Sequence, residues 1–370
     1  MTNILKKLPI KLIGVLFLLG IVVVWFTNHD DFLYSQPIMQ VQSAKKVNTY
    51  KNVDSFQNVD HNYEQRLTGI ITNGKHRGQK ITFNSSYTDS QAMDRPYKTG
   101  QKAFVVLHSS KGKITSATIK DYKRDVAVVT LIYVAMALMF LFLKVAGLTA
   151  IGSIIINTLL FAAAIYLDGF NNGANVLWIF SILAVLFSAI TLWLVIGWNR
   201  QMLVTLSTTI ACTLISILIS LVVFAFTHEK GIYYESMQYV TQPPRPLFLA
   251  ETIIGSLGAV MDESTDIISS LFALKMERPE ISAKQIFLSG RNIGKSIMGP
   301  LVNVLFFIFM GETLSMTLLF LKNGNSWGYS FSMNMSLGMV QSLISGIGIV
   351  LAVPIASALT AMFIKKGEAK

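Results

Sequence analysis

The chain is a succession of long apolar runs interrupted by one polar segment. The first apolar run covers residues 10–26, and polar residues then dominate from 27 to 125. Further apolar runs follow at residues 126–143, 148–167, 176–197, 203–226, 297–321 and 337–364. A helix of about 20 apolar residues crosses the ~30 Å hydrocarbon core of a bilayer. The pattern therefore predicts an α-helical integral membrane protein.

One more run, residues 246–274, is long enough to cross but carries four acidic residues. These are Glu251, Asp262, Glu263 and Asp266. Loop charge tests whether it crosses, because cytoplasmic loops near membrane spans collect Lys and Arg. If it crosses, few basic residues lie in the short loops on the side opposite the N-terminus, namely Lys230, Arg245 and Lys322. We therefore expect about eight transmembrane helices, seven of them in a membrane core of residues 126–370, with both termini cytoplasmic.

The N-terminal residues 1–26 have the pattern of an export signal, with Lys6, Lys7 and Lys11 around the start of an apolar run. Such a pattern fits either a signal peptide or an uncleaved anchor. We favour a signal-anchor helix, because polar residues rather than a small-x-small cleavage site follow the run. Trp25 also suits a membrane interface.

The polar segment, residues 27–125, is extracytoplasmic in this orientation. Short β-type stretches occur at 63–72, 80–83, 103–107 and 114–119, separated by turn residues such as Asn73-Gly74. They predict a small β-rich domain, either a barrel or a sandwich, over about residues 64–120. The stretch before it is rich in Asn, Gln, Lys and Ser, which is typical of a linker.

Composition supports the membrane class and narrows the choice of partners. Apolar residues make up 52% of the chain and charged residues only 14%, against roughly 25% charged in an average soluble domain. The net charge is +11, but the basic residues are scattered over short loops and the polar segment. Topology and contact with the membrane surface explain this distribution. We therefore expect the lipid bilayer, and no nucleic acid, as a partner.

Residues three and four apart on a helix share a face. In the acidic run, this spacing places Glu251, Gly255, Gly258, Asp262 and Asp266 in one stripe. An acid at mid-depth in a bilayer costs roughly 3 kcal/mol even on a lenient scale. We therefore expect the stripe to turn inward and to line a hydrophilic path or a proton or cation site. The alternative is an amphipathic helix on the membrane surface.

Small and polar residues of the following apolar runs could face this stripe. They are Gly299, Asn303 and Glu312, then Gln341 in the last run, while Gly290 and Gly294 precede these runs. Asn303, Glu312 and Gln341 are candidates for the same path, and the glycines are candidates for close helix packing. Packing alone would also explain the polar residues.

The sequence gives little support for catalysis. Asp262 and Asp266 lie on one helix and cannot face each other as a proton-sharing pair. No HExxH or complete P-loop motif occurs. We therefore expect no enzyme activity, identify no cofactor beyond possible proton or cation coupling, and leave the identity of any metal open.

Three segments of the chain resemble the YibE/F-like multi-pass membrane proteins of bacteria. They read RLTGIITNGKHRGQKITFNSS…YKTGQKAFVVL, LAETIIGSLGAVMDESTDIISSLFAL and GRNIGKSIMGPLVNVLFFIFMGETL. The resemblance implies a protein of the bacterial cytoplasmic membrane with an outer N-terminal domain and a permease-like helical core. It implies motif positions at Gly258, Asp262, Gly290, Gly294 and Asn303, but no established reaction or substrate.

Two functional hypotheses follow. The first is a transporter or permease for a small solute or ion, in which Asp262 is the main coupling group and Asp266 and Asn303 assist. The second is a membrane scaffold or envelope assembly factor whose outer β domain binds a partner. Either protein could form a homo-oligomer or pair with a related membrane protein.

Overall fold

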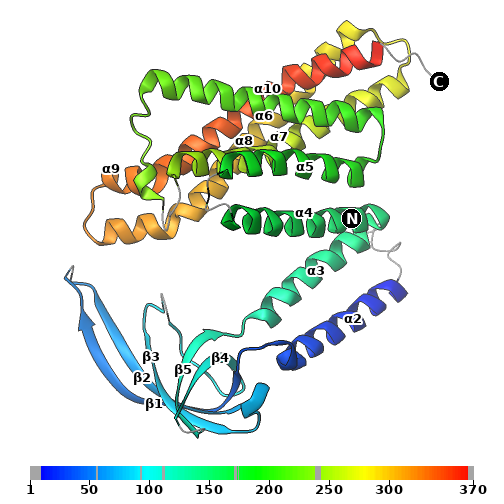
Figure 1. Cartoon of the computed structure of the whole chain (residues 1–370). Helices are drawn as coiled ribbons and strands as arrows, with labels where there is room; N and C mark the ends of the chain where they lie inside the picture. Colours follow the sequence, from blue (N-terminus) through cyan, green and yellow to red (C-terminus); the bar gives the residue numbers. More distant parts are fainter. Residues whose placement is uncertain are drawn as a thin grey trace. The chain divides into compact units, whose positions relative to one another are not determined.

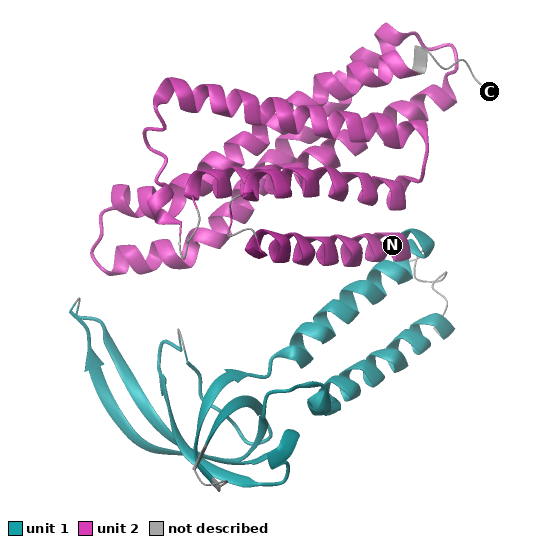
Figure 2. Cartoon of the chain, in the orientation of Figure 1, with its two compact units in different colours: residues 1–147 teal, residues 148–370 magenta. Residues whose placement is uncertain are grey.

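The computed structural model describes residues 10–55, 57–91, 94–110, 113–170, 173, 175–237 and 243–365. The chain divides into two compact units, Met1–Gly147 and Leu148–Lys370, which Figure 2 distinguishes by colour. Among the described residues, the first contains a β-sheet and the helices α2 and α3, and all regular elements of the second are helical (Figure 1).

The first unit begins with a helix and ends with another, and the sheet lies between them in the sequence. Its elements are α2 (Ile10–His29), the 3-10 turn η1 (Asp30–Leu33), β1 (Ile38–Val53), β2 (Val59–Ile71), η2 (Gly74–His76), β3 (Lys80–Thr88), β4 (Lys102–Ser110), β5 (Lys113–Tyr122) and α3 (Asp125–Leu143). Helices α2 and α3 pack side by side, and the Tyr133 hydroxyl donates a hydrogen bond to the carbonyl of Leu16. Gly20 permits this contact, because a Cβ at that position would lie 2.9 Å from the Tyr133 ring.

The five strands form one antiparallel sheet in the order β3-β2-β1-β4-β5. Its core is the cluster of Met39, Val41, Leu67, Ile71 and Val105, all nearly inaccessible to solvent. Edge strands β3 and β5 also lie close to each other, so the sheet curls toward a barrel. The β-rich domain predicted from the sequence is therefore a small, strongly curved antiparallel sheet.

The stretch interpreted as a linker contains the longest strand, β1, and that part of the prediction is wrong. Only Ile38, Met39 and Val41 of β1 are buried, and most of the strand beyond them is exposed. Two register shifts, after Val41 and after Lys46, further interrupt the alternation. A strand with a short apolar segment and bulges lacks the period-two pattern on which the prediction relied.

The second unit consists of long helices joined by short connections. Its elements are α4 (Val145–Phe170), α5 (Val176–Ile196), α6 (Arg200–Thr227), the 3-10 turn η3 (Tyr234–Ser236), α7 (Pro244–Glu277), α8 (Ala283–Lys322), α9 (Trp327–Ser330), the π-helical turn η4 (Phe331–Met335) and α10 (Ser336–Lys365). Helix α7 packs against α5, α6, α8 and α10, and α10 packs against α6, α7 and α8. These two helices therefore form the centre of the unit.

Helix α8 begins earlier than the apolar run at residues 297–321 suggested. Ser282 caps it, accepting a hydrogen bond from the backbone N–H of Gln285, whose side chain bonds back to the Ser282 N–H. This capping box starts the helix in a polar segment, which hydropathy does not detect.

Seven helical segments are long and apolar enough to cross a membrane among the residues described. They comprise α2, α3, α4, α5, α6, α8 and the segment from α9 to α10. These segments support a membrane protein. Helix α7 is not one of the seven, because its acidic residues make it less apolar.

Candidate ion site in the helical unit

The acidic stripe of α7 lies on the exposed face of the helix. Glu251, Gly255, Gly258, Asp262 and Asp266 are all exposed in the single chain. The expectation that this stripe turns inward is therefore wrong for one copy of the chain. The spacing correctly grouped these residues on one face, but it could not determine which face of α7 packs against its neighbours.

The buried face of α7 is also polar. It carries Thr252, Ser256, Glu263 and Ser264, none of which is more than 1% exposed. Glu263 is adjacent to Asp262 in the sequence but points about 100° away from it around the helix. Of the four acids in the stretch first identified, Glu263 is therefore the one that the bundle encloses.

The surroundings of Glu263 follow from its neighbours on the same face. One turn before it, Val260 packs with Cys212 of α6 and Ala352 of α10. One turn after it, Ile267 belongs to a cluster that includes Val204 of α6 and Val353 of α10. Glu263 thus lies at the level where α6, α7 and α10 meet.

Hydroxyl side chains are concentrated in the buried parts of these three helices. On α6 they are Thr205, Thr208, Thr209, Thr213, Ser216 and Ser220, and on α10 they are Ser336, Ser342, Ser345, Ser357 and Thr360. Several donate their proton to a carbonyl of their own helix, as Thr209 does to Thr205 and Ser357 to Val353. A hydroxyl that donates in this way still presents oxygen lone pairs. The buried parts of these three helices therefore contain many neutral oxygen atoms and one carboxyl group.

Some of these buried oxygens have no hydrogen-bond partner among the described residues. They are Oε1 of Glu263, Oγ of Ser264, Oγ1 of Thr213 and Oγ1 of Thr360. No basic side chain in the described part of the chain forms an ion pair with Glu263. A buried carboxylate without a partner is strongly unfavourable. Such a group is stabilised by holding a proton or by binding a cation.

Sequence reasoning noted Glu263 but assigned it no role. A signal was present, because Thr252, Ser256, Ala259 and Glu263 repeat at intervals of three and four residues. Both faces of α7 were thus marked by small or polar residues. Only tertiary packing distinguishes the buried face from the exposed one.

The other predicted path residues are not assembled around the acids. Gln341 of α10 donates a weak hydrogen bond, 3.4 Å long, to the backbone carbonyl of Glu251. Asn303 and Glu312 are exposed on α8, and neither forms a hydrogen bond or ion pair with α7 among the described residues. Gln341 is therefore the one that the structure brings to the acidic stripe.

The five predicted glycines fall into two groups. A Cβ at Gly255 would lie 2.6 Å from Nε2 of Gln341, and one at Gly294 would lie 2.6 Å from the Val353 side chain. Gly290 is equally confined, by Ser357 of α10. Gly258 and Gly299 face open space, so close packing does not account for them within one chain.

Comparison with known proteins gives two matches that together cover nearly the whole chain. A family model described as YibE/F-like protein matches residues 131–366. A model of the YibE/F family N-terminal domain matches residues 32–122. The resemblance seen in the sequence motifs is therefore confirmed. No curated protein and no solved structure matches the chain.

Proposed function

The chain belongs to the YibE/F-like protein family, and we propose that its helical unit is a membrane transporter for protons or a small hard cation. Glu263 is the ionisable group of the proposed pathway. The observation that carries the proposal is its burial, 1% exposed, with one carboxyl oxygen unpartnered among the described residues.

The proposal includes α7 as an eighth transmembrane helix. Its 34 residues extend about 51 Å at 1.5 Å per residue, which exceeds the ~30 Å hydrocarbon core. Four membrane-type helices or segments pack around it. A polar helix surrounded by apolar ones is typical of proteins whose intramembrane acids have a transport role.

The chemistry of the interior suits a proton or a hard cation. Carboxylate and hydroxyl oxygens are the ligands that such cations prefer, and a carboxyl group can also carry a proton between two sides of a membrane. Asp262 and Asp266 lie on the exposed face, where contact with lipid would cost roughly 3 kcal/mol for each acid. We infer that water or a second membrane-embedded subunit covers this face.

Flux measurements on the full chain in proteoliposomes test the role of Glu263. The probes are an internal pH dye for protons and dyes for Na⁺, K⁺ and Mg²⁺. We expect Glu263→Gln to lower flux of the transported ion at least about tenfold, equivalent to about 1.4 kcal/mol. Glu263→Asp should retain part of the flux, because it keeps the carboxyl group. Glu280→Gln, at an exposed acid beyond α7, is the matched control and should transport normally.

Membrane insertion of each variant is compared by its amount in washed membranes. Wild-type flux at the level of empty vesicles for all four probes would refute the proposal, as would full activity of Glu263→Gln. If Glu263→Gln leaves the cellular function of the protein intact while deletion of residues 62–122 abolishes it, the scaffold hypothesis explains the protein better than the transporter hypothesis.

A further inference from the structure

A second stripe of small and polar residues on α7, the Glu263 stripe, changes from buried to exposed within one turn. Its members follow each other at alternating intervals of four and three residues, a spacing that keeps them on one side of the helix. They are Thr252, Ser256, Ala259, Glu263, Asp266 and Ser270. The first four are buried, whereas Asp266 and Ser270 are exposed. Glu263 is therefore the last buried member of the stripe, and Asp266 is the first exposed one.

Glu263 and Asp266 are close enough to exchange a proton. Residues three apart on a helix have Cβ atoms about 5–6 Å apart, so their carboxyl groups can be joined directly or through one water molecule. Two carboxylates at this distance repel each other where the dielectric constant is low, and such a pair holds one proton between them. Asp262 is also exposed, but it points about 100° away from Glu263. Asp266 is therefore the exposed acid that shares the Glu263 stripe.

Towards the N-terminal end of α7, the interior contains a hydroxyl without a hydrogen-bond partner among the described residues. It belongs to Thr213 of α6, which is 6% exposed. The Thr213 carbonyl accepts a hydrogen bond from Ser216, and Ser216 lies where Val260 of α7 approaches Gly348 of α10. Buried polar groups of this kind usually bond an internal water molecule. Thr213 therefore marks a place, about one turn from Glu263, that suits water.

The helices are packed closely at this level. A Cβ at Gly348 would lie 2.7 Å from the Val260 side chain and 3.5 Å from the Ser216 hydroxyl, so α6, α7 and α10 are in contact here. Divalent cations take about six or more oxygen ligands, some of them water, and need room for them. A proton needs only a chain of hydrogen bonds, because it passes from one oxygen to the next. The buried side of Glu263 therefore suits protons better than metal cations.

Towards the C-terminal end of α7, the interior next to Glu263 is apolar. Ile267 packs in a cluster with Val204 of α6 and Val353 of α10, and both Ile267 and Val204 are inaccessible to solvent. A charged group gains no hydrogen bonds from such a cluster. The polar continuation from Glu263 on this side is therefore Asp266, one turn along the stripe.

We propose that the ion carried at Glu263 is a proton and that Asp266 exchanges it with water at the exposed face of α7. This inference rests on the transport role proposed above for Glu263. The protonated Glu263 carboxyl gives its proton to the Asp266 carboxylate, which then gives it to water. A water molecule bonded to the Thr213 hydroxyl returns a proton to the Glu263 carboxylate from the buried side. In each transfer one O–H bond breaks and another forms, so that only the proton moves.

Proton flux into proteoliposomes of the full chain tests the role of Asp266. It is recorded with an internal pH dye, with choline as the sole cation besides protons, and again with Na⁺, K⁺ or Mg²⁺ added. We expect Asp266→Asn to lower the flux at least about tenfold, since a positioned proton-transfer group contributes that much or more. Asp266→Glu should retain part of the flux, because it keeps the carboxyl group. Glu277→Gln, at an exposed acid in the last turn of α7, is the matched control and should transport normally.

The hydroxyl on the buried side has its own test. Thr213→Val removes the unpartnered hydroxyl at nearly constant volume and should lower proton flux, whereas Thr213→Ser keeps the hydroxyl and should preserve it. Thr208→Val is the matched control on the same helix, because the buried Thr208 hydroxyl already donates to the carbonyl of Val204. Equal flux in Thr213→Val and Thr208→Val would overturn the route on this side.

The outcomes separate this inference from the transport role itself. If flux that depends on Glu263 is carried by Na⁺, K⁺ or Mg²⁺ and not by protons, the transport role stands and the assignment of the proton is wrong. Full proton flux in Asp266→Asn, or an equal loss in Glu277→Gln, would overturn the role of Asp266. The amount of each variant in washed membranes is compared as before.

Discussion

At the scale of single residues, Lys123 and Tyr97 of the β-sheet domain both have raised pKa values. Burial alone would lower the pKa of Lys123, but hydrogen bonds to Asp125 and Asp30 outweigh it and raise the pKa. Burial raises the pKa of Tyr97, a core residue of the sheet, from 10.0 to about 12. Both groups therefore favour the fold in their protonated forms.

Deprotonation of these two groups should destabilise the β-sheet domain at high pH. A raised pKa stabilises the fold fully below the unfolded value and loses that contribution as pH rises through the folded value. For Tyr97, the loss falls between pH 10 and about 12. We expect Tyr97→Phe to retain more thermal stability than wild type in this interval and to match it more closely near neutrality.

The measurement is thermal unfolding of the full chain in detergent across this pH range, with tyrosinate absorbance recorded in parallel. Tyr50→Phe, at a tyrosine that is 58% exposed, is the matched control and should follow wild type. If the two variants lose stability identically above pH 10, the burial of the Tyr97 phenol does not control the response.

At the scale of secondary-structure elements, the close contact between α8 and α10 depends on glycine, which has no side chain. A Cβ at Gly294 would lie 2.6 Å from the Val353 side chain, whereas nothing lies within 4 Å of a Cβ at Gly311 of the same helix. We expect Gly294→Leu to be less stable than Gly311→Leu by about 1–3 kcal/mol, the usual cost of overpacking. Both changes bring a similar gain in helix propensity, so their difference in melting temperature in detergent reports packing. Equal melting temperatures would contradict the close contact.

The apolar runs predicted most helix ends to within three residues, because hydropathy records which segments avoid water. The start of α8 was missed because a polar capping box sets it. Strand β1 was missed because bulges and exposed residues interrupt its alternation. On α7, the residue spacing correctly placed Asp262 and Glu263 on different faces of the helix. It could not identify the buried face, since that depends on how α6 and α10 pack.

At the scale of the whole molecule, whether α7 crosses the membrane determines on which side the loops lie. Single cysteines at Lys230 and Glu280, exposed residues on either side of α7, are introduced into a Cys212→Ser background. An impermeant thiol reagent added to intact cells should label Lys230→Cys but not Glu280→Cys. Lys322→Cys, beyond α8, should label like Lys230→Cys. Labelling of both Lys230→Cys and Glu280→Cys in intact cells would show that α7 does not cross.

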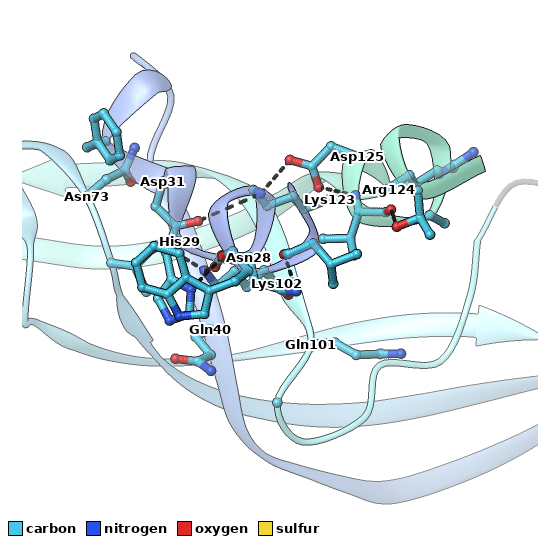
Figure 3. A pocket seen from close by; sticks show the side chains of 18 of the residues that line it. Asn28, His29, Asp31, Gln40, Asn73, Gln101, Lys102, Lys123, Arg124 and Asp125 are labelled. Atoms are coloured by element: carbon cyan, nitrogen blue, oxygen red, sulfur yellow. Dashed lines mark hydrogen bonds and ion pairs between the residues drawn. The ribbon is translucent and has the colours of Figure 1, made fainter. Parts of the chain in front are cut away.

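The ammonium of Lys123 pairs with Asp30, which follows α2, and with Asp125, which begins α3 (Figure 3). One buried cation thus connects the segment that enters the sheet with the segment that leaves it. A domain held by a single flexible tether could rotate without moving its anchor. Here the two attachments share one buried cation, so we expect the sheet and the two helices to move together as one rigid body.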